Sequence, residues 1–209
     1  MQQPASTLKC KALASNASLP ISPFAFGLAW VAFLPACQNA DDIIHAARFG
    51  DLQKLNACIQ SGIQVDHADP TGETALFHVI GAGSDKAFGL LMENNANIRL
   101  RDNLGNTTLH KAVTYGRREF AVQLIEGGLD INATNKVGAT VLHYAVRSAN
   151  LDMVGFLMDK GADVGLKDVE GNSSVEVARG MREEEGLSGP MGQPISKKQI
   201  NKIISALTK

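Results

Sequence analysis

Apolar side chains in residues 41–207 recur with the spacing of short amphipathic helices. One stripe marks a helix in successive segments of the chain and comprises Leu55, Cys58, Phe88, Leu91, Leu124, Phe156 and Leu157. The last segment carries Ile200, Ile203, Ile204 and Leu207, spaced i, i+3, i+4 and i+7 on one helical face. The pattern predicts a chain built from pairs of short helices.

Two series of turn residues repeat at an interval of 33 residues. The first series is Gly72, Gly105, Gly138 and Gly171, and the second is Gly62, Asn95, Gly128 and Gly161. Glycine adopts positive φ without a Cβ penalty, so the first series predicts tight turns. The second series predicts helix ends in the left-handed conformation, which Asn also tolerates.

Hydroxyl side chains follow the first glycine series at a fixed distance, at Thr74, Thr107, Thr140 and Ser173. Such residues accept hydrogen bonds from free amides at the first turn of a helix, so we expect them to be N-caps. Ser173 and Glu176 have the spacing of a capping box, as do Ser196 and Gln199 before the last helix.

The segments Gly105-Asn-Thr-Thr-Leu-His110, Gly138-Ala-Thr-Val-Leu-His143 and Gly161-Ala-Asp163 resemble the ankyrin repeat. The resemblance implies an all-α solenoid of about 4.5–5 repeats over residues 41–209, with atypical N- and C-terminal caps. The units are expected at 41–67, 68–100, 101–133, 134–166 and 167–209. A charged, Gly-rich interruption at 182–194 separates the two helices of the last unit, and loops of this length are often functional or mobile.

The first 36 residues differ in composition from the rest of the chain, because no acidic residue precedes Asp41. Lys9 and Lys11 are followed by an apolar run at 24–34, the order of a secretory signal peptide. The run has 11 residues, too few for a membrane span of about 20. We therefore predict export of residues 37–209.

Residues Leu34-Pro35-Ala36-Cys37 resemble the lipobox of bacterial lipoproteins. The resemblance implies acylation of Cys37, a linker at 37–40 and a lipid-anchored periplasmic domain, with Gln38 favouring the outer membrane. Cys58 would then be the only free thiol of the mature chain, and no intramolecular disulfide is expected. The alternative is a short signal that ends at a free thiol.

Charge and composition favour neither nucleic-acid binding nor catalysis. The chain has 20 basic and 21 acidic residues, which gives no positive field for a phosphate backbone. His110 and His143 occupy the same position of successive repeats, so we expect each to bond a neighbouring turn rather than a metal. The sequence therefore predicts no enzyme, no metal, no cofactor and no small-molecule substrate.

Candidate binding residues follow from the repeat phase, because ankyrin partners usually meet the concave face and the turn tips. On the concave face these are His45, Arg48, Phe49, His78, Lys111, Thr114, Tyr115, Tyr144 and Arg147. At the tips they are Asp69, Arg101, Asn103, Asn135, Lys136, Lys167 and Glu170. Tyr, Phe and Arg commonly dominate protein interfaces.

These features predict a protein-binding lipoprotein rather than an enzyme. By analogy with small exported immunity proteins, we expect an inhibitor that neutralises a toxic effector, such as a lipase delivered to the periplasm, by occluding its active site. The alternative is a periplasmic chaperone or scaffold that supports a resident enzyme, for example in protection against oxidative stress.

Overall fold

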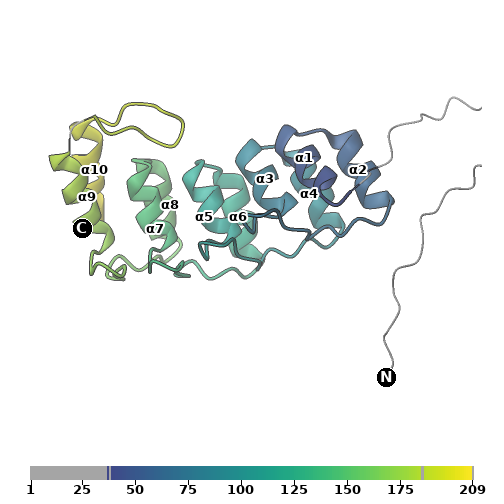
Figure 1. Cartoon of the computed structure of the whole chain (residues 1–209). Coiled ribbons are helices and arrows are strands. Elements are labelled where there is room, and N and C mark those ends of the chain that lie inside the picture. The colour runs from purple at the N-terminus through teal and green to yellow at the C-terminus, as the bar shows by residue number, and fades with distance from the viewer. Residues whose placement is uncertain (1–36, 38, 185, 209) are drawn as a thin grey trace, which may run out of the picture. The chain divides into compact units, whose positions relative to one another are not determined.

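The protein is described by a computed structural model covering residues 37, 39–184 and 186–208. These residues form ten helices: α1 (Asp41–Phe49), α2 (Leu52–Gln60), α3 (Ala75–Ala82), α4 (Asp85–Glu93), α5 (Thr108–Thr114), α6 (Arg118–Glu126), α7 (Val141–Arg147), α8 (Leu151–Asp159), α9 (Ser174–Glu183) and α10 (Lys197–Leu207) (Figure 1). None of the described helices is long and apolar enough to cross a membrane. The all-α prediction is confirmed, whereas the predicted signal peptide lies outside the described residues.

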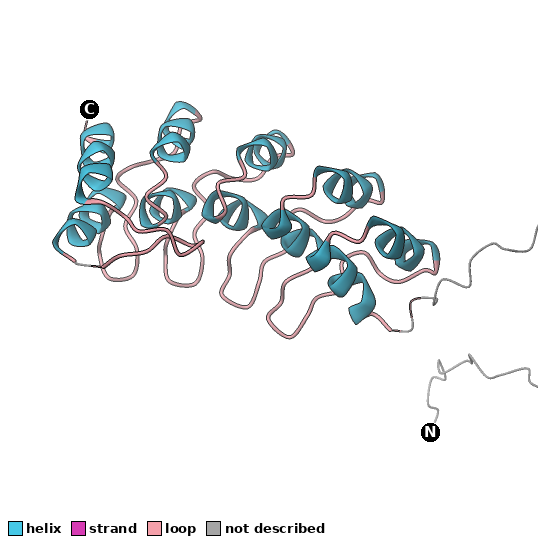
Figure 2. Cartoon of the chain, turned by 90° about the horizontal axis from the view of Figure 1, so that it is seen from above, coloured by secondary structure: helices cyan, strands magenta, loops and turns pink. Residues whose placement is uncertain are grey.

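The helices pack in two rows. Helices α1, α3, α5, α7 and α9 form one row in which neighbours are in contact, and the second helices of the pairs form the row beside it (Figure 2). Small residues such as Ala46, Ala112 and Ala145 are fully buried between the helices, which lets the backbones approach closely. Phe88 and Phe120 stack with ring centroids 4.6 Å apart and join the second helices of two pairs.

A projecting turn connects each pair to the next, and we call residues 68–74, 101–107, 134–140 and 167–173 the finger turns. Each is closed by an antiparallel bridge between its first and last residue, such as that between Arg101 and Thr107. Gly105, inside this turn, has a φ of 80°, a conformation that side chains disfavour. The predicted turn glycines therefore have the expected conformation.

Most predicted caps form, with one exception. Thr107, Thr140 and Ser173 accept from the backbone of the third helical residue, and the Ser173–Glu176 capping box is present. Thr74 occupies the same N-cap position, but its hydroxyl makes no cap bond and is buried without a partner among the described residues. The reason is local, because Phe77 replaces the histidine that completes the box in the two following repeats.

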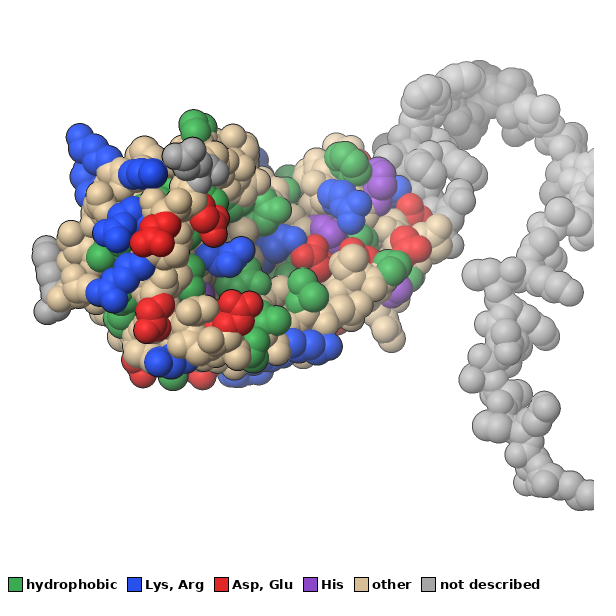
Figure 3. Space-filling view, turned by 60° about the vertical axis from the view of Figure 1, so that its left-hand side comes forward, with side chains coloured by type: hydrophobic (Ala, Val, Ile, Leu, Met, Phe, Trp, Pro, Cys, Tyr) green, Lys and Arg blue, Asp and Glu red, His purple; other side chains and the backbone are tan. Residues whose placement is uncertain are grey.

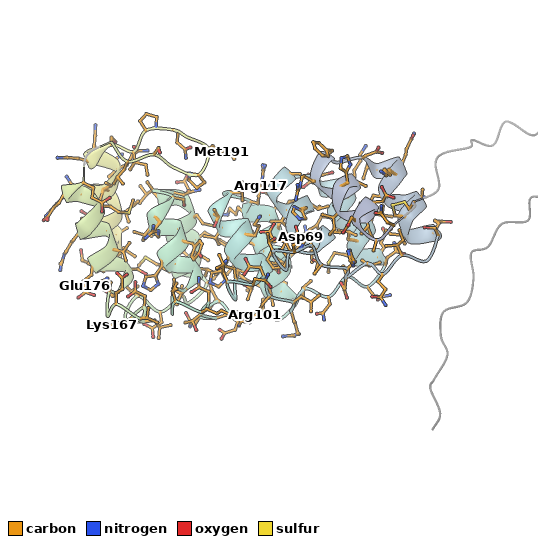
Figure 4. The ribbon with its side chains drawn as sticks, viewed as in Figure 1. Asp69, Arg101, Arg117, Lys167, Glu176 and Met191 are labelled. Carbon is orange, nitrogen blue, oxygen red and sulfur yellow. A yellow bond between two sulfur atoms is a disulfide. The ribbon has the colours of Figure 1, made fainter. Side chains whose placement is uncertain are left out.

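The C-terminal end is closed by α10, which packs against α8 and α9. It is the displaced second helix of the last pair, as the apolar spacing predicts. Between α9 and α10, a bridge from Ser188 to Pro194 forms a hairpin with Met191 at its exposed tip. Figure 4 places Met191 at the edge opposite Arg101 and Lys167, which begin two finger turns. The hairpin and the α7–α8 turn border a cavity of about 500 Å³.

The N-terminal end of the described solenoid carries a disulfide that was not expected from the sequence. A disulfide joins Cys37 to Cys58, with 5.1 Å between their Cα atoms. The expectation that no intramolecular disulfide forms is therefore wrong. A sulfur bonded to Cys58 cannot also form a thioether to a lipid, so this disulfide and the acylation that the lipobox resemblance implies are mutually exclusive at Cys37. Sequence reasoning missed the pair because the lipobox resemblance assigned Cys37 to acylation, which left Cys58 without a partner.

Candidate functional site

Three exposed aliphatic side chains lie on three successive finger turns. Leu104 is 65% exposed, Val137 is 54% exposed and Val169 is 71% exposed. We call these three residues the tip strip. Large apolar side chains are normally withdrawn from water, and neighbouring exposed ones commonly mark an interaction site. In the view of Figure 3, exposed hydrophobic side chains lie among acidic and basic ones.

Backbone hydrogen bonds between adjacent turns hold the tip strip in place. The amide of Lys136 donates to the carbonyl oxygen of Leu104 over 3.0 Å, and the amide of Val169 donates to that of Val137 over 3.0 Å. Within this part of the solenoid, each turn is thereby bonded to its neighbour at the level of the exposed residues. The strip is organised before any partner arrives, which lowers the entropic cost of binding.

A cavity of about 460 Å³ opens beside the tip strip, between α7 and α9. Its lining includes the tip-strip residues Val137 and Val169 and also Tyr144, Arg147, Val177, Asp168 and Glu170. Arg147 is exposed and forms no ion pair or hydrogen bond with the described residues. The cavity therefore combines apolar side chains with one guanidinium group and two carboxylates.

The hydroxyl of Tyr144, a predicted binding residue, forms hydrogen bonds within the solenoid. Its hydroxyl donates to Oδ1 of Asn106 over 2.8 Å and accepts from Nδ2 of Asn135 over 3.0 Å. Burial raises the pKa of this phenol above its ordinary value. Only the ring of Tyr144 is left to meet a partner, since its polar atom is already satisfied.

All three predicted residues of the first repeat, His45, Arg48 and Phe49, are exposed. Phe49 is 69% exposed, and its ring centroid lies 4.6 Å from that of His45. Arg48 is also exposed and approaches Asp69 at 3.7 Å.

In the third repeat, the hydroxyl of Thr114 donates to the carbonyl oxygen of His110, and Lys111 Nζ lies 5.6 Å from the ring centroid of Tyr115.

A network of alternating charge crosses the first three repeats. Asp69 Oδ2 lies 2.9 Å from His78 Nε2, and Glu73 Oε2 lies 3.7 Å from His78 Nδ1. Lys111 Nζ donates to Glu73 Oε1 over 2.5 Å, and Arg48 approaches Asp69 from the other side. Sequence reasoning missed this network, because His78 departs from the histidine position of the repeat and gave no ligand spacing.

Electrostatics favours an ion-pair network over a metal centre here. Asp69, Glu73 and His78 each offer a ligand atom within 4.8 Å of one another, but Arg48 and Lys111 already neutralise the two carboxylates. Burial alone would raise the pKa of Asp69, yet hydrogen bonds from Thr71, His78 and the Glu73 amide outweigh burial and lower that pKa to about 2.

Several predicted tip residues hold the turns rather than face a partner. Arg101 donates to the carbonyl oxygens of Gly105 and Thr134, and Asn135 is 8% exposed with its side chain bonded inside its own turn. Asn103 and Lys136 are exposed, but each donates from its side chain to the preceding turn. Lys167 and Glu170 are exposed at the last finger turn.

The two repeat histidines serve the solenoid, as their shared phase predicts. Nε2 of His110 lies 3.1 Å from the carbonyl oxygen of Ala139, and Nε2 of His143 lies 3.1 Å from that of Asn172. Each Nδ1 accepts from the backbone of its own N-cap threonine. Both histidines therefore link one repeat to the turn of the next.

Comparison with known families agrees with the repeat arrangement. A model of three ankyrin repeats matches residues 43–135, and a second model of many ankyrin repeats matches residues 124–178. Together they cover 43–178, which is well over half of the chain. No curated protein matches the chain.

Proposed function

Because the chain belongs to the ankyrin-repeat family, whose repeats form protein-interaction modules, we propose that it is a non-catalytic protein that binds another protein through the tip strip and the adjoining cavity. The observation that carries this proposal is the exposure of Leu104, Val137 and Val169 on successive turns. These three side chains lie outside the buried core, and covering their apolar surface with a partner would lower the free energy of the complex.

The cavity adds residue types that support binding. The Arg147 side chain has no partner within the described part of the chain, and the ring of Tyr144 lies next to it on α7. Arginine and tyrosine are enriched among the few residues that dominate interface energetics, particularly where apolar neighbours exclude water from them. The tip strip would supply the apolar neighbours, so the strip and the cavity form one continuous candidate interface.

We propose further that the mature domain acts outside the cytoplasm as an inhibitor of a toxic effector, such as a lipase delivered to the periplasm. The Cys37–Cys58 disulfide supports export, because disulfides persist in oxidising compartments. The order of cationic and apolar residues within 1–36 supports it independently. A pre-organised surface with a cavity suits an inhibitor that covers an active-site entrance.

The proposal is tested by capture followed by substitution. The exported chain serves as bait for secreted and periplasmic proteins, and a captured protein is purified and titrated against the wild type, V137D and V169D. Placing a carboxylate in the strip should weaken binding about tenfold or more. The effector's own activity is measured in the same titration and should fall at a ratio of one inhibitor to one effector.

Met92→Asp is the matched control, because Met92 is 37% exposed on α4, a helix of the second row. M92D should bind like the wild type. If V137D, V169D and M92D all bind equally well, the interface lies elsewhere and the assignment to the tip strip fails. If the captured protein keeps its full activity when saturated, the inhibitor role fails while protein binding stands.

A further inference from the structure

Cys37 and Cys58 meet at the N-terminal end of the solenoid. Cys58 lies on α2 and is fully buried in the core of the first repeat. Cys37 precedes α1 and packs, half-buried, against the same core. Their Cα separation of 5.1 Å falls within the range that a disulfide spans without moving the backbone.

The first repeat lacks a device that later repeats share. Among the described residues no finger turn precedes α1, and Ala40 at the N-cap supplies no side-chain hydrogen bond. Asn39 and Asp42 exchange hydrogen bonds at this helix start, but both bonds are exposed to water. The Cys37–Cys58 disulfide lies just before Asn39 and links the segment before α1 covalently to α2. It therefore fixes the start of the first repeat, as a finger turn does in the later repeats.

We infer that Cys37 is an oxidation site rather than an acylation site, and that its disulfide with Cys58 is the N-terminal cap of the mature solenoid. The inference rests on the export part of the proposed function. In forming the bond, the two thiols lose two protons and two electrons. The electrons pass to a disulfide-bearing thiol oxidant of the exported compartment, which is reduced to its dithiol.

The cap should contribute measurably to stability. The two cysteines are 21 residues apart in sequence, and closing a loop of that length restricts the unfolded chain. Losing the bond should lower the Tm by about 5–10 °C for a domain of this size. The loss should be felt mainly in the first repeat, because each repeat contacts only its neighbours.

The test uses the full-length chain, expressed with its own N-terminal segment and recovered from the exported fraction. Intact-mass analysis is combined with thiol alkylation before and after reduction. We expect residues 37 and 58 to resist alkylation until a reductant is added, with a mass two hydrogens below that of the dithiol. A lipid thioether on Cys37, or two thiols that react without reduction, would overturn the inference.

Melting curves separate the bond from packing at Cys58. A reductant should lower the Tm of the wild type but leave C37S and C58S unchanged, and C37S/C58S should melt no lower than C58S. A reductant effect that persists in C37S would also overturn the inference. Because the tip strip lies in other repeats, C37S should still bind the captured partner, so failure here is distinguishable from failure of partner binding. Recovery of the chain only from the cytoplasm would overturn export, and the inference with it.

Discussion

The imidazole of His110 donates from Nε2 to the carbonyl oxygen of Ala139, 3.1 Å away and one repeat further along the chain. Its other nitrogen accepts from the Thr107 amide over 3.2 Å. The bonding pattern requires the neutral ring, because a proton on Nδ1 would face a donor. Burial is the largest cause that lowers the pKa of His110, from 6.5 to about 4.

The domain should therefore lose stability in mild acid. Above pH 6.5 the ring is neutral in both the folded and the unfolded chain, and its contribution is complete. As the pH falls from 6.5 to about 4, the unfolded chain takes up a proton that the folded chain excludes, which costs about 3 kcal/mol of unfolding free energy. Urea unfolding across this range measures the loss. H110Q should show a shallower slope, and an unchanged slope would contradict the assignment.

The hydroxyls of Thr74 and Thr140 should contribute differently to the free energy of unfolding, although they occupy the same repeat position. Thr140 Oγ1 lies 2.8 Å from Nδ1 of His143, whereas Thr74 Oγ1 is buried and has no partner in the described structure. Replacing Thr140 by Val should cost about 1–2 kcal/mol, and replacing Thr74 by Val should cost less than about 0.5 kcal/mol. Equal losses in chemical denaturation would show that Phe77 does not alter the cap.

Two turn glycines with the same conformation should differ in their tolerance of alanine. Gly72 and Gly171 have φ values of 82° and 83°. A Cβ at Gly72 would lie 2.7 Å from the amide nitrogen of Asn103, whereas a Cβ at Gly171 would meet nothing within 4 Å. We expect G171A to lose about 1 kcal/mol from backbone strain alone and G72A to lose about 2 kcal/mol or more. Thermal melts of the two variants, side by side, would refute this if G72A were the more stable.

The hydroxyl of Tyr144 should stabilise the fold. Tyr144→Phe removes a bridge between Asn106 and Asn135 and should lower the unfolding free energy by about 1 kcal/mol. Tyr115→Phe is the control, because the Tyr115 hydroxyl makes no hydrogen bond with the described residues, and it should have almost no effect. If Y144F were as stable as the wild type, the hydroxyl would not be needed for the fold, and the whole Tyr144 side chain would be available to a partner.

Positions that repeat could be predicted from sequence, and positions that break the repeat could not. The turn glycines, the Ser173–Glu176 box and the role of His110 follow from phase, because equivalent residues meet equivalent surroundings. The exposure of Val137 could not be predicted, because a valine in a turn is equally able to pack inward. Likewise, the contact of His78 with Asp69 depends on side-chain positions that no spacing rule supplies.

The bonds between neighbouring finger turns also determine how this surface can change length. From Leu104 to Lys136, and from Val137 to Val169, the same donor and acceptor positions meet at each step. A 33-residue unit added or removed as a whole would keep donor opposite acceptor at every step. The surface can therefore grow or shrink by whole repeats without loss of these bonds, and the size of a partner it covers would change in the same discrete increments.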